Sequence, residues 1–291
     1  MKIVNIKGGL GNQMLQYALA YRLKKLLPSE EVLLDLTSFK GYKWHVYELK
    51  YVFDVDIPVA SFSQLMKVTC PFSLNTRLGG YMRAIYNRLG LNKREYVEDG
   101  HSGYSEDVFQ KEGDWYFDGY WTNQKYFADI REDILKIFSF RRELDVQNKQ
   151  TLDEIHSTNS VSIHVRRGNY LLFDTYKGIC EVDYYQRAID YIKAHVDNPH
   201  FFIFSNDMEW CKENLSAFME NYTFVGNNSG MSNYVDMQLM SNCKHNIIAN
   251  STFSWWGAWL NTHENKIVVS PEKWLNIEMK ESPLLDEWVK L

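Results

Sequence analysis

Two neighbouring arginines that follow a short strand pattern are the residues best suited to chemistry in this chain. Apolar and polar residues alternate from Val161 to Val165, which predicts a strand, and Gly168 predicts a turn directly after it. In open α/β sheets, ligands bind just beyond the carboxyl ends of strands, where Arg166 and Arg167 lie. An arginine side chain offers a rigid fork of donors that matches phosphate oxygens, so the pair indicates a polyanion site. The alternative is an ordinary surface ion pair with a nearby carboxylate.

The elements that must position these arginines form a regular series from residue 161 onward. Strand and helix patterns alternate with short connections, which predicts a doubly wound parallel sheet. The expected strands are Val161–Val165, Phe201–Ser205, Tyr222–Val225, Asn246–Ala249 and Lys266–Val269. The expected helices are Asp183–His195, Met208–Leu215, Asn233–Asn242 and Thr252–Asn261. We therefore expect an α/β protein with an N-terminal domain over residues 1–150 and a C-terminal domain over residues 151–291.

The N-terminal half begins with a strand pattern at Ile3–Ile6, a glycine-rich loop and a helix pattern at Met14–Leu23. The loop reads Gly8-Gly9-Leu10-Gly11-Asn12-Gln13. Free N–H groups at a helix start bind phosphate, so this loop is a candidate phosphate cradle. It is not a G-x-G-x-x-G loop, because Met14 replaces the third glycine, and it is not a Walker A loop. The missing glycine argues against a nicotinamide-dependent dehydrogenase. A second strand is expected at Val32–Leu36 and a further helix at Ile130–Phe140.

Other strands of the second half also end in residues that could bind a nucleotide diphosphate. Ser205-Asn206-Asp207 follows one strand, and Asn250-Ser251-Thr252 follows another at the start of a helix. Hydroxyl groups, free backbone N–H groups and the helix dipole all favour an anion there. Helix capping alone explains one of these hydroxyls, but it does not explain polar residues at three strand ends.

The composition is that of a soluble globular protein without a charge signature for nucleic acid. The chain has 291 residues, of which 45% are hydrophobic and 24% charged, and its formal net charge is −5. An anionic ligand therefore needs a local site. The aromatic content of 15% indicates either a large core or stacking on sugars or bases.

The cysteines and the N-terminus bear on the compartment. Cys70, Cys180, Cys211 and Cys243 form no C-x-x-C pair, which argues against a zinc or redox motif and fits a reducing compartment. The N-terminus runs directly into a strand pattern without a signal peptide, and no apolar run reaches membrane-spanning length. We therefore expect a cytoplasmic location.

Two further sequence features each allow a functional and an ordinary structural interpretation. Asp54-Val55-Asp56 has the D-x-D spacing that can hold a metal on a nucleotide diphosphate, but surface carboxylates are the better interpretation. The segment Lys67–Arg94 contains no Asp or Glu, and Tyr81, Ile85 and Leu89 recur in it at helical spacing. This pattern predicts a basic amphipathic helix, either packed on its domain or resting on an anionic membrane surface.

The ordered motifs together resemble the bacterial α1,2-fucosyltransferases, which are inverting enzymes that use GDP-fucose. The resemblance spans nearly the whole chain and rests on the glycine-rich loop, on His164-Val165-Arg166-Arg167-Gly168, on Ser205-Asn206-Asp207 and on the run from Asn250 to Leu260. That last run contains Trp255, Trp256 and Trp259 at near-helical spacing, for which core packing is the better interpretation than sugar stacking.

The resemblance implies two Rossmann-like domains that face each other across a cleft, the GT-B architecture, with GDP-fucose held chiefly by the C-terminal domain and the acceptor on the side of the N-terminal domain. It implies that Arg166 stabilises the β-phosphate of the leaving group and that Gly11 and Asn12 close over the phosphates, Asn12 with a catalytic role. Arg167 would be partly structural. The remaining substrate-binding residues that it implies are His164, Asn206, Asp207, Asp236, Ser251, Thr252 and Phe253.

Some of these roles have structural alternatives. His164 and Asp236 would read guanine, yet His164 could be a satisfied core histidine and Asp236 a solvated helix residue. The general base stays open, with Asp174 and Glu181 close enough in sequence to be considered. The family usually carries Asp where this chain has Asn169.

The implied activity is transfer of L-fucose from GDP-fucose in α1,2 linkage to a terminal galactose, with inversion and with neither metal nor cofactor. The acceptor would be a galactose-terminated oligosaccharide or a lipid-linked glycan. The alternatives are a transferase of another GDP-sugar and a non-catalytic glycan-binding module, although a lectin has no use for paired arginines at a strand end.

Overall fold

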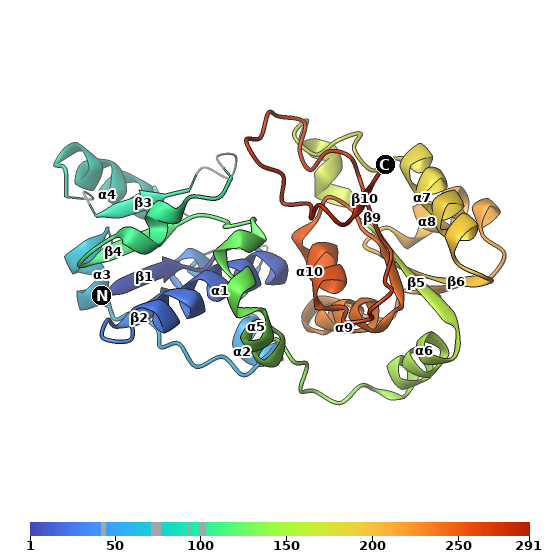
Figure 1. Cartoon of the computed structure of the whole chain (residues 1–291). Helices are drawn as coiled ribbons and strands as arrows, with labels where there is room; N and C mark the ends of the chain where they lie inside the picture. The colour runs from blue at the N-terminus through green and yellow to red at the C-terminus, as the bar shows by residue number, and fades with distance from the viewer. Residues whose placement is uncertain (42–44, 71–76, 92–93, 99–102) are drawn as a thin grey trace. The chain divides into compact units, whose positions relative to one another are not determined.

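The computed structural model describes residues 1–41, 45–70, 77–91, 94–98 and 103–291. They form two compact units, Met1–Arg141 and Arg142–Leu291 (Figure 1). The division that we expected after residue 150 falls inside a helix, α6 (Val146–Ser157), of the second unit.

Unit 1, residues Met1–Arg141, is built on a parallel sheet. Within the described residues its strand order is β2-β1-β4-β3. The strands are β1 (Lys2–Asn5), β2 (Val32–Asp35), β3 (Glu95–Val97) and β4 (Trp115–Asp118). The helices are α1 (Leu10–Leu26), α2 (Leu49–Val52), α3 (Phe62–Val68), α4 (Arg77–Arg88) and α5 (Arg131–Ile137). Short 3-10 turns are η1 (Thr37–Phe39), η2 (Glu106–Gln110), η3 (Gln124–Tyr126) and η4 (Ala128–Ile130).

Unit 2, residues Arg142–Leu291, contains a second parallel sheet in the order β10-β9-β8-β5-β6-β7. Its strands are β5 (Asn159–Val165), β6 (Pro199–Ser205), β7 (Tyr222–Val225), β8 (His245–Ile247), β9 (Val268–Ser270) and β10 (Val289–Lys290). Its helices after α6 are α7 (Val182–His195), α8 (Met208–Leu215), α9 (Tyr234–Asn242) and α10 (Thr252–Leu260). Its 3-10 turns are η5 (Gly168–Leu172), η6 (Ser216–Phe218) and η7 (Gly230–Ser232).

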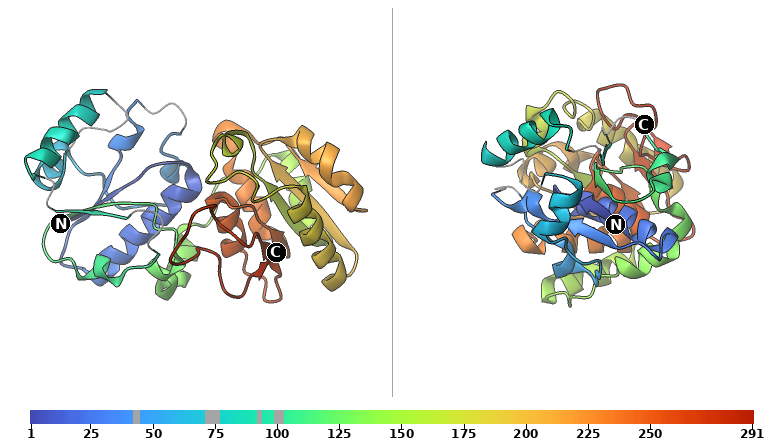
Figure 2. Two further views of the ribbon diagram at one scale, coloured as in Figure 1. Left: turned by 90° about the horizontal axis from the view of Figure 1, so that it is seen from above. Right: turned by 90° about the vertical axis from the view of Figure 1, so that its left-hand side faces the viewer.

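Helices cover both faces of the unit 2 sheet, with α7 and α8 on one face and α9 and α10 on the other (Figures 1 and 2). Val161, Ile163 and Val165 of β5 enter the core beneath α7 and α8, because successive side chains of a strand point to opposite faces. On the other face the β5 residue Ser162 accepts a hydrogen bond from the Asn246 amide of β8 at 2.7 Å. Trp255, Trp256 and Trp259 of α10 are fully buried, which confirms the prediction that they pack in a core.

Two sequence features with ordinary structural alternatives lie in unit 1. Asp54 forms an ion pair with Arg141 at 2.5 Å, and Asp56 forms one with Lys24 at 2.8 Å. The D-x-D carboxylates are therefore surface ion-pair partners, in line with the interpretation as surface carboxylates that we preferred from the sequence. The predicted basic helix is α4, in which Gly79 is the buried residue.

No helix in the described part of the chain has both the length and the apolar character needed to cross a membrane.

Candidate functional site

Apart from Asp236, the predicted site residues of unit 2 lie where three adjacent parallel strands end. In the register of the sheet, Val165 at the end of β5 pairs with Ser205 at the end of β6, and Ile163 pairs with Ile247 of β8. The residues that follow these strands are therefore neighbours at the carboxyl edge of one sheet. This edge is where doubly wound sheets bind their ligands.

Arg166 and Arg167 diverge to opposite sides of the sheet because side-chain direction alternates along β5. The Arg167 guanidinium lies 3.3 Å from Glu181 and 3.5 Å from Asp207, and it stacks 4.2 Å from the centre of the Trp210 ring. The contact of its Nε with Asp207 is an ion pair without hydrogen-bond geometry. The charge of Arg167 is thus engaged inside unit 2, which matches the partly structural role that the sequence indicated.

Arg166 has no carboxylate partner among the described residues. Its Nη2 donates to the neutral Asn169 Oδ1 at 3.3 Å, and its guanidinium lies 5.3 Å from the centre of the Tyr170 ring. A cation that is held only by an amide and an aromatic face keeps its charge available for an anion.

The turn after the arginines requires glycine at residue 168. Gly168 has φ +66°, and an added Cβ would lie 2.8 Å from Asn206 Nδ2. The Arg167 backbone N–H donates to Asn206 Oδ1 at 2.9 Å, so the end of β6 fixes this turn. The predicted ligand residue Asn206 therefore has a structural role, and Asp207 has another as the N-cap of α8, accepting from the Trp210 N–H at 3.3 Å.

His164 lies on the same side of β5 as Arg166 and is buried, with 6% of its surface exposed. Burial lowers its pKa to about 3, and the charge of Arg166 acts in the same direction, so the ring is neutral at physiological pH. Its buried Nδ1 has no hydrogen-bond partner among the described residues, and its ring lies 5.6 Å from that of Phe253. A buried ring nitrogen without a partner favours a ligand-binding histidine over a satisfied core histidine.

The third strand end leads into α10. Ser251 caps this helix by accepting from the Phe253 N–H at 3.4 Å, and the first turn of the helix contains no acidic residue. Asn250 is buried, accepts from the Cys180 thiol at 3.6 Å and donates to the Trp274 carbonyl at 3.2 Å. Ser251 and Thr252 are therefore placed at a helix start that suits an anion.

A small pocket lies beside Arg166 and includes residues that sequence analysis missed. Its lining comprises Arg166, Arg167, Tyr170, Leu171, Tyr176, Lys177, Gly178, Cys180, Glu181 and Asn250. Tyr170 and Tyr176 stack with their ring centres 4.5 Å apart. Burial raises the pKa of Tyr170, so its phenol stays protonated at neutral pH and can donate a hydrogen bond.

Asn276, in the C-terminal segment, holds the loop that carries Tyr176 and Lys177. Its side-chain amide donates to the carbonyls of Asp174 at 2.8 Å and Lys177 at 2.7 Å. Its backbone N–H donates to the carbonyl of Thr175 at 2.9 Å. No sequence signal pointed to Asn276, because it lies about a hundred residues from the loop.

Asp236 lies in the first turn of α9, near the end of β7. It accepts a hydrogen bond from Asn228 at 2.7 Å, and Asn228 also donates to Asn148 of α6 at 3.1 Å. Burial raises the pKa of Asp236 to about 7, although the hydrogen bond from Asn228 opposes the change. Asp236 is thus partly buried and anchored, rather than the solvated helix residue that was the alternative.

In unit 1 the glycine-rich loop starts α1 earlier than the sequence pattern indicated. Gly8 has φ +79°, and an added Cβ would lie 2.8 Å from Asn12 Nδ2. Gly11 is buried in the first turn and Asn12 follows it. Gln13 holds the loop, donating to the Gly8 carbonyl at 2.9 Å and accepting from the Glu48 N–H at 2.9 Å. The predicted phosphate contacts of Gly11 and Asn12 stay predictions.

The general base stays open, and the two candidates have different surroundings. Glu181 is engaged by Arg167, and the side chain of Asp174 is exposed at the loop that Asn276 holds. Across the described ranges, no three His, Cys, Asp or Glu side chains come together as a possible metal site.

The fold is shared with solved fucosyltransferase structures. NodZ α-1,6-fucosyltransferase soaked with GDP-fucose matches with a TM-score of 0.51 and 14% identity over 89% of this chain and 91% of that chain. Fucosyltransferase NodZ from Bradyrhizobium matches with a TM-score of 0.52 and 14% identity over 88% and 91%. At this identity the likeness shows the fold alone, and it confirms the predicted α/β fold with parallel sheets. A cleft between the two units stays a prediction.

The comparisons of sequence identify the chain as a glycosyltransferase. Residues 92–291 match the family model described as Glycosyl transferase family 11. Alpha-1,2-colitosyltransferase from Escherichia coli is 34% identical over 99% of this chain and 98% of its own. Galactoside alpha-(1,2)-fucosyltransferase 2 from Sus scrofa is 26% identical over 99% of this chain and 79% of its own. The chain belongs to glycosyl transferase family 11, which confirms the resemblance inferred from its motifs.

Proposed function

We propose that the protein transfers L-fucose from GDP-fucose to the 2-hydroxyl of a terminal galactose on a glycan, with inversion at the anomeric carbon. The observation that carries this proposal is Arg166, a cation at the carboxyl end of β5 that has no carboxylate partner among the described residues. A relative named a galactoside α-(1,2)-fucosyltransferase supports the choice of sugar, linkage and acceptor.

The diphosphate of the donor binds at the pocket that Arg166 and Lys177 line. Arginine can engage two phosphate oxygens at once, and the N-terminus of α10 adds a favourable dipole. The guanine base is read by neutral His164 and by Asp236, which accepts from the N1–H and the exocyclic amine of guanine. Adenine and the pyrimidines lack that pair of donors.

In the reaction, an acceptor hydroxyl attacks C1 of fucose from the face opposite GDP. The new C1–O bond forms as the bond to the β-phosphate oxygen breaks, and the hydroxyl proton passes to a base. Negative charge grows on the β-phosphate, so Arg166 contributes most in the transition state. We expect this charge stabilisation to suffice without a divalent metal, so activity should persist in a chelator. Loss in chelator with recovery on adding manganese would contradict that expectation.

A second donor deserves a direct comparison, because one relative that is 34% identical over nearly the whole chain is named an α-1,2-colitosyltransferase. Colitose is fucose without its 3-hydroxyl. A site that hydrogen-bonds this hydroxyl rejects the deoxy sugar by roughly 10⁴-fold, whereas a site that leaves it in solvent discriminates little. The ratio of kcat/KM for GDP-fucose and GDP-colitose therefore decides between the two donors.

The proposal is tested by incubating the full chain with GDP-fucose and lactose and determining the product linkage by NMR. An α1,2-linked fucose on galactose is expected. A thermal-shift panel of GDP, UDP, CMP and NAD should show stabilisation by GDP, because a ligand of the folded state raises the melting temperature. No product with either donor, together with no shift by GDP, would overturn the proposed function.

We further propose a peripheral contact between unit 1 and an anionic membrane surface, where a lipid-linked glycan would be presented on the cytoplasmic side. In the described part of α4, Leu78 and Tyr81 are more than half exposed and Arg77 and Arg88 are exposed. Lys93 and residues 71–76 of the predicted basic segment lie outside the described residues. Each surface Lys or Arg contributes about 1 kcal/mol to such binding.

Liposome flotation tests this contact. At low salt we expect more protein with anionic than with neutral vesicles, and the double variant Arg77→Glu, Arg88→Glu should lose the difference. Equal flotation of the original protein with both vesicle types would leave α4 as an ordinary surface helix.

A further inference from the structure

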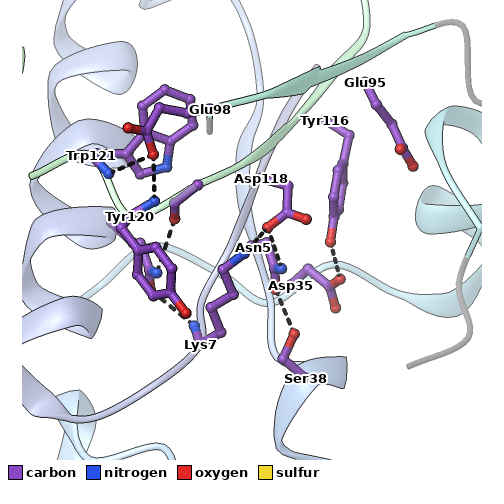
Figure 3. Close-up of polar contacts among 12 residues, drawn as sticks. Asn5, Lys7, Asp35, Ser38, Glu95, Glu98, Tyr116, Asp118, Tyr120 and Trp121 are labelled. Atoms are coloured by element: carbon purple, nitrogen blue, oxygen red, sulfur yellow. Dashed lines mark hydrogen bonds and ion pairs between the residues drawn. The ribbon is translucent and has the colours of Figure 1, made fainter. Parts of the chain in front are cut away.

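The carboxyl edge of the unit 1 sheet carries a polar cluster that the donor site does not use. The cluster combines Asn5 and Asp118, the last residues of β1 and β4, with Lys7 and Tyr120, which lie just beyond these strands, and with Glu98, which follows β3 (Figure 3). Because the strands are parallel, all of these residues gather at one edge.

Asp118 is an oriented carboxylate with one oxygen left to accept. Its Oδ1 accepts from Asn5 Nδ2 at 2.9 Å and from Lys7 Nζ at 2.5 Å (Figure 3). Burial alone would raise the pKa of Asp118, but the charge and hydrogen bond of Lys7 and the hydrogen bond from Asn5 lower it. Asp118 is largely buried, with 8% of its surface exposed, and within the described residues both hydrogen bonds fall on Oδ1, so Oδ2 is the oxygen that can accept from a ligand.

Lys7 and Tyr120 complete a surface with mixed chemistry. The Lys7 ammonium has three donors, and the carboxylate of Asp118 takes one of them. The same ammonium lies 5.0 Å from the centre of the Tyr120 ring, and Tyr120 is 41% exposed. An exposed aromatic face thus stands beside a donor and an acceptor of fixed orientation.

The backbone that presents Tyr120 is clamped by Glu98. Its Oε2 accepts from the N–H of Tyr120 at 2.9 Å, and a Cβ at Gly119 would lie 2.5 Å from Glu98 Cβ. Trp121, next in the chain, is fully buried with φ +55°. The ring of Tyr120 is therefore held outward by its neighbours on both sides.

A neighbouring carboxylate shows what a purely structural group looks like at the same edge. Asp35 accepts from the Tyr116 hydroxyl at 2.7 Å, and from the Thr37 N–H at 2.8 Å and hydroxyl at 3.0 Å. Both of its oxygens are thus engaged by the fold. Asp118 differs, because both of its donors bond to Oδ1 and, within the described residues, Oδ2 accepts no hydrogen bond.

From this arrangement we infer that the cluster of Lys7, Asp118 and Tyr120 binds the galactose end of the acceptor, an inference that rests on the proposed function. A sugar ring has an apolar C–H face that packs on an aromatic ring and vicinal hydroxyls that both donate and accept. An anionic ligand is disfavoured here, because the negative charge of Asp118 would repel it. The lowered pKa of Asp118 suits it to orient a hydroxyl rather than to remove its proton.

The test uses the full chain with lactose as the acceptor and GDP-fucose as the donor. For Asp118→Asn and for Tyr120→Ala, we expect the KM for lactose to rise about tenfold or more, since a charged hydrogen bond or a ring contact is lost. GDP affinity and the slow hydrolysis of GDP-fucose without acceptor should stay within about twofold of the original protein. Tyr120→Phe keeps the ring and should retain most of the affinity.

Asp114→Asn is the matched control, because Asp114 lies before β4 at the opposite edge and pairs with the N-terminal amine at 3.0 Å. An unchanged lactose KM in both Asp118→Asn and Tyr120→Ala, or a parallel loss of GDP affinity, overturns the inference while the proposed function stands. If the original protein makes no product, lactose binding is measured by saturation-transfer NMR. Binding that depends on Tyr120 then supports the sugar site without the activity, and no binding overturns it.

Discussion

The carboxyl edges of the two sheets use charge in opposite ways. In unit 1 the ammonium of Lys7 is paired with the carboxylate of Asp118, so the two charges of this pair balance each other. In unit 2 the guanidinium of Arg166 has a neutral amide and an aromatic ring as its contacts. The balanced edge suits a neutral, hydroxyl-rich ligand, and the unbalanced edge suits an anion.

The same contrast exists between neighbours in sequence. Arg167 is surrounded by two carboxylates and the Trp210 ring, whereas Arg166 extends from the other side of β5. Because side chains alternate along a strand, a shift of one residue separates Arg167, which stabilises the fold, from Arg166, which is available to a ligand.

The largest expected effect comes from removing the available cation. Arg166→Ala should lower kcat at least a hundredfold, since one donor aimed at developing charge contributes about 3 kcal/mol. Arg167→Ala should instead lower the melting temperature, because Glu181 and Asp207 lose their partner. Steady-state kinetics and thermal unfolding of both variants measure this. Equal, mild kinetic losses would erase the distinction between the two arginines.

A smaller effect should follow from loosening the pocket without touching its charge. Asn276→Ala removes the side-chain hydrogen bonds to the Asp174 and Lys177 carbonyls, so we expect the KM for the donor to rise about tenfold. Asn214→Ala is the control, since it removes a helix-surface hydrogen bond to the Trp210 carbonyl in α8. A donor KM that changes equally in both variants would show that Asn276 acts only through stability.

The pH dependence of GDP binding sharpens the role of Asp236. Its pKa of about 7 in the folded chain lies above the unfolded value, so protonation favours the fold and stability falls as pH rises from about 4 to 7. Guanine needs the ionised carboxylate, so GDP affinity should increase severalfold from pH 6 to pH 8. In Asp236→Asn, the rise of GDP affinity with pH should shrink to the part that comes from ionisation of the GDP phosphate. The same slope in the variant and the original protein would remove Asp236 from the base site.

The smallest effect is expected at Asn169, where the family resemblance predicts an Asp. Asn169→Asp would give Arg166 a charged partner in place of the amide at 3.3 Å, so GDP affinity should weaken by tenfold at most. A better aligned guanidinium should keep turnover the same or raise it. Calorimetry and kinetics of the one variant suffice. Unchanged values for both would assign Asn169 to the turn alone.

The sequence predicted most of unit 2 because its elements show clear periodicity. Helix α8 and strand β7 have the expected bounds, and β5 extends the expected strand by two residues at its start. Unit 1 was harder to predict because β3 and β4 are short and aromatic, and nothing local distinguishes Trp115–Asp118 from a loop. Contacts between residues far apart in the chain, such as those of Asn276 with the loop after Phe173, produce no periodic pattern in the sequence.

The candidate site divides in the same way. The arginines and the residues after each strand could be found from sequence, because strand ends and residue chemistry are local properties. Which of them hold the fold could not be predicted, since Asn206, Asp207 and Arg167 are engaged by contacts across strands. Lys7 and Asp118 are likewise far apart in the chain and meet only through parallel pairing of β1 with β4.

The most direct test is titration calorimetry of GDP against the original chain, Arg166→Ala and Asp118→Asn. If the edge of unit 2 holds the donor diphosphate, Arg166→Ala should weaken GDP binding by about tenfold or more, the scale of one charged hydrogen bond. Asp118→Asn should bind GDP like the original chain. Equal affinity in all three proteins, or a loss confined to Asp118→Asn, would contradict the account.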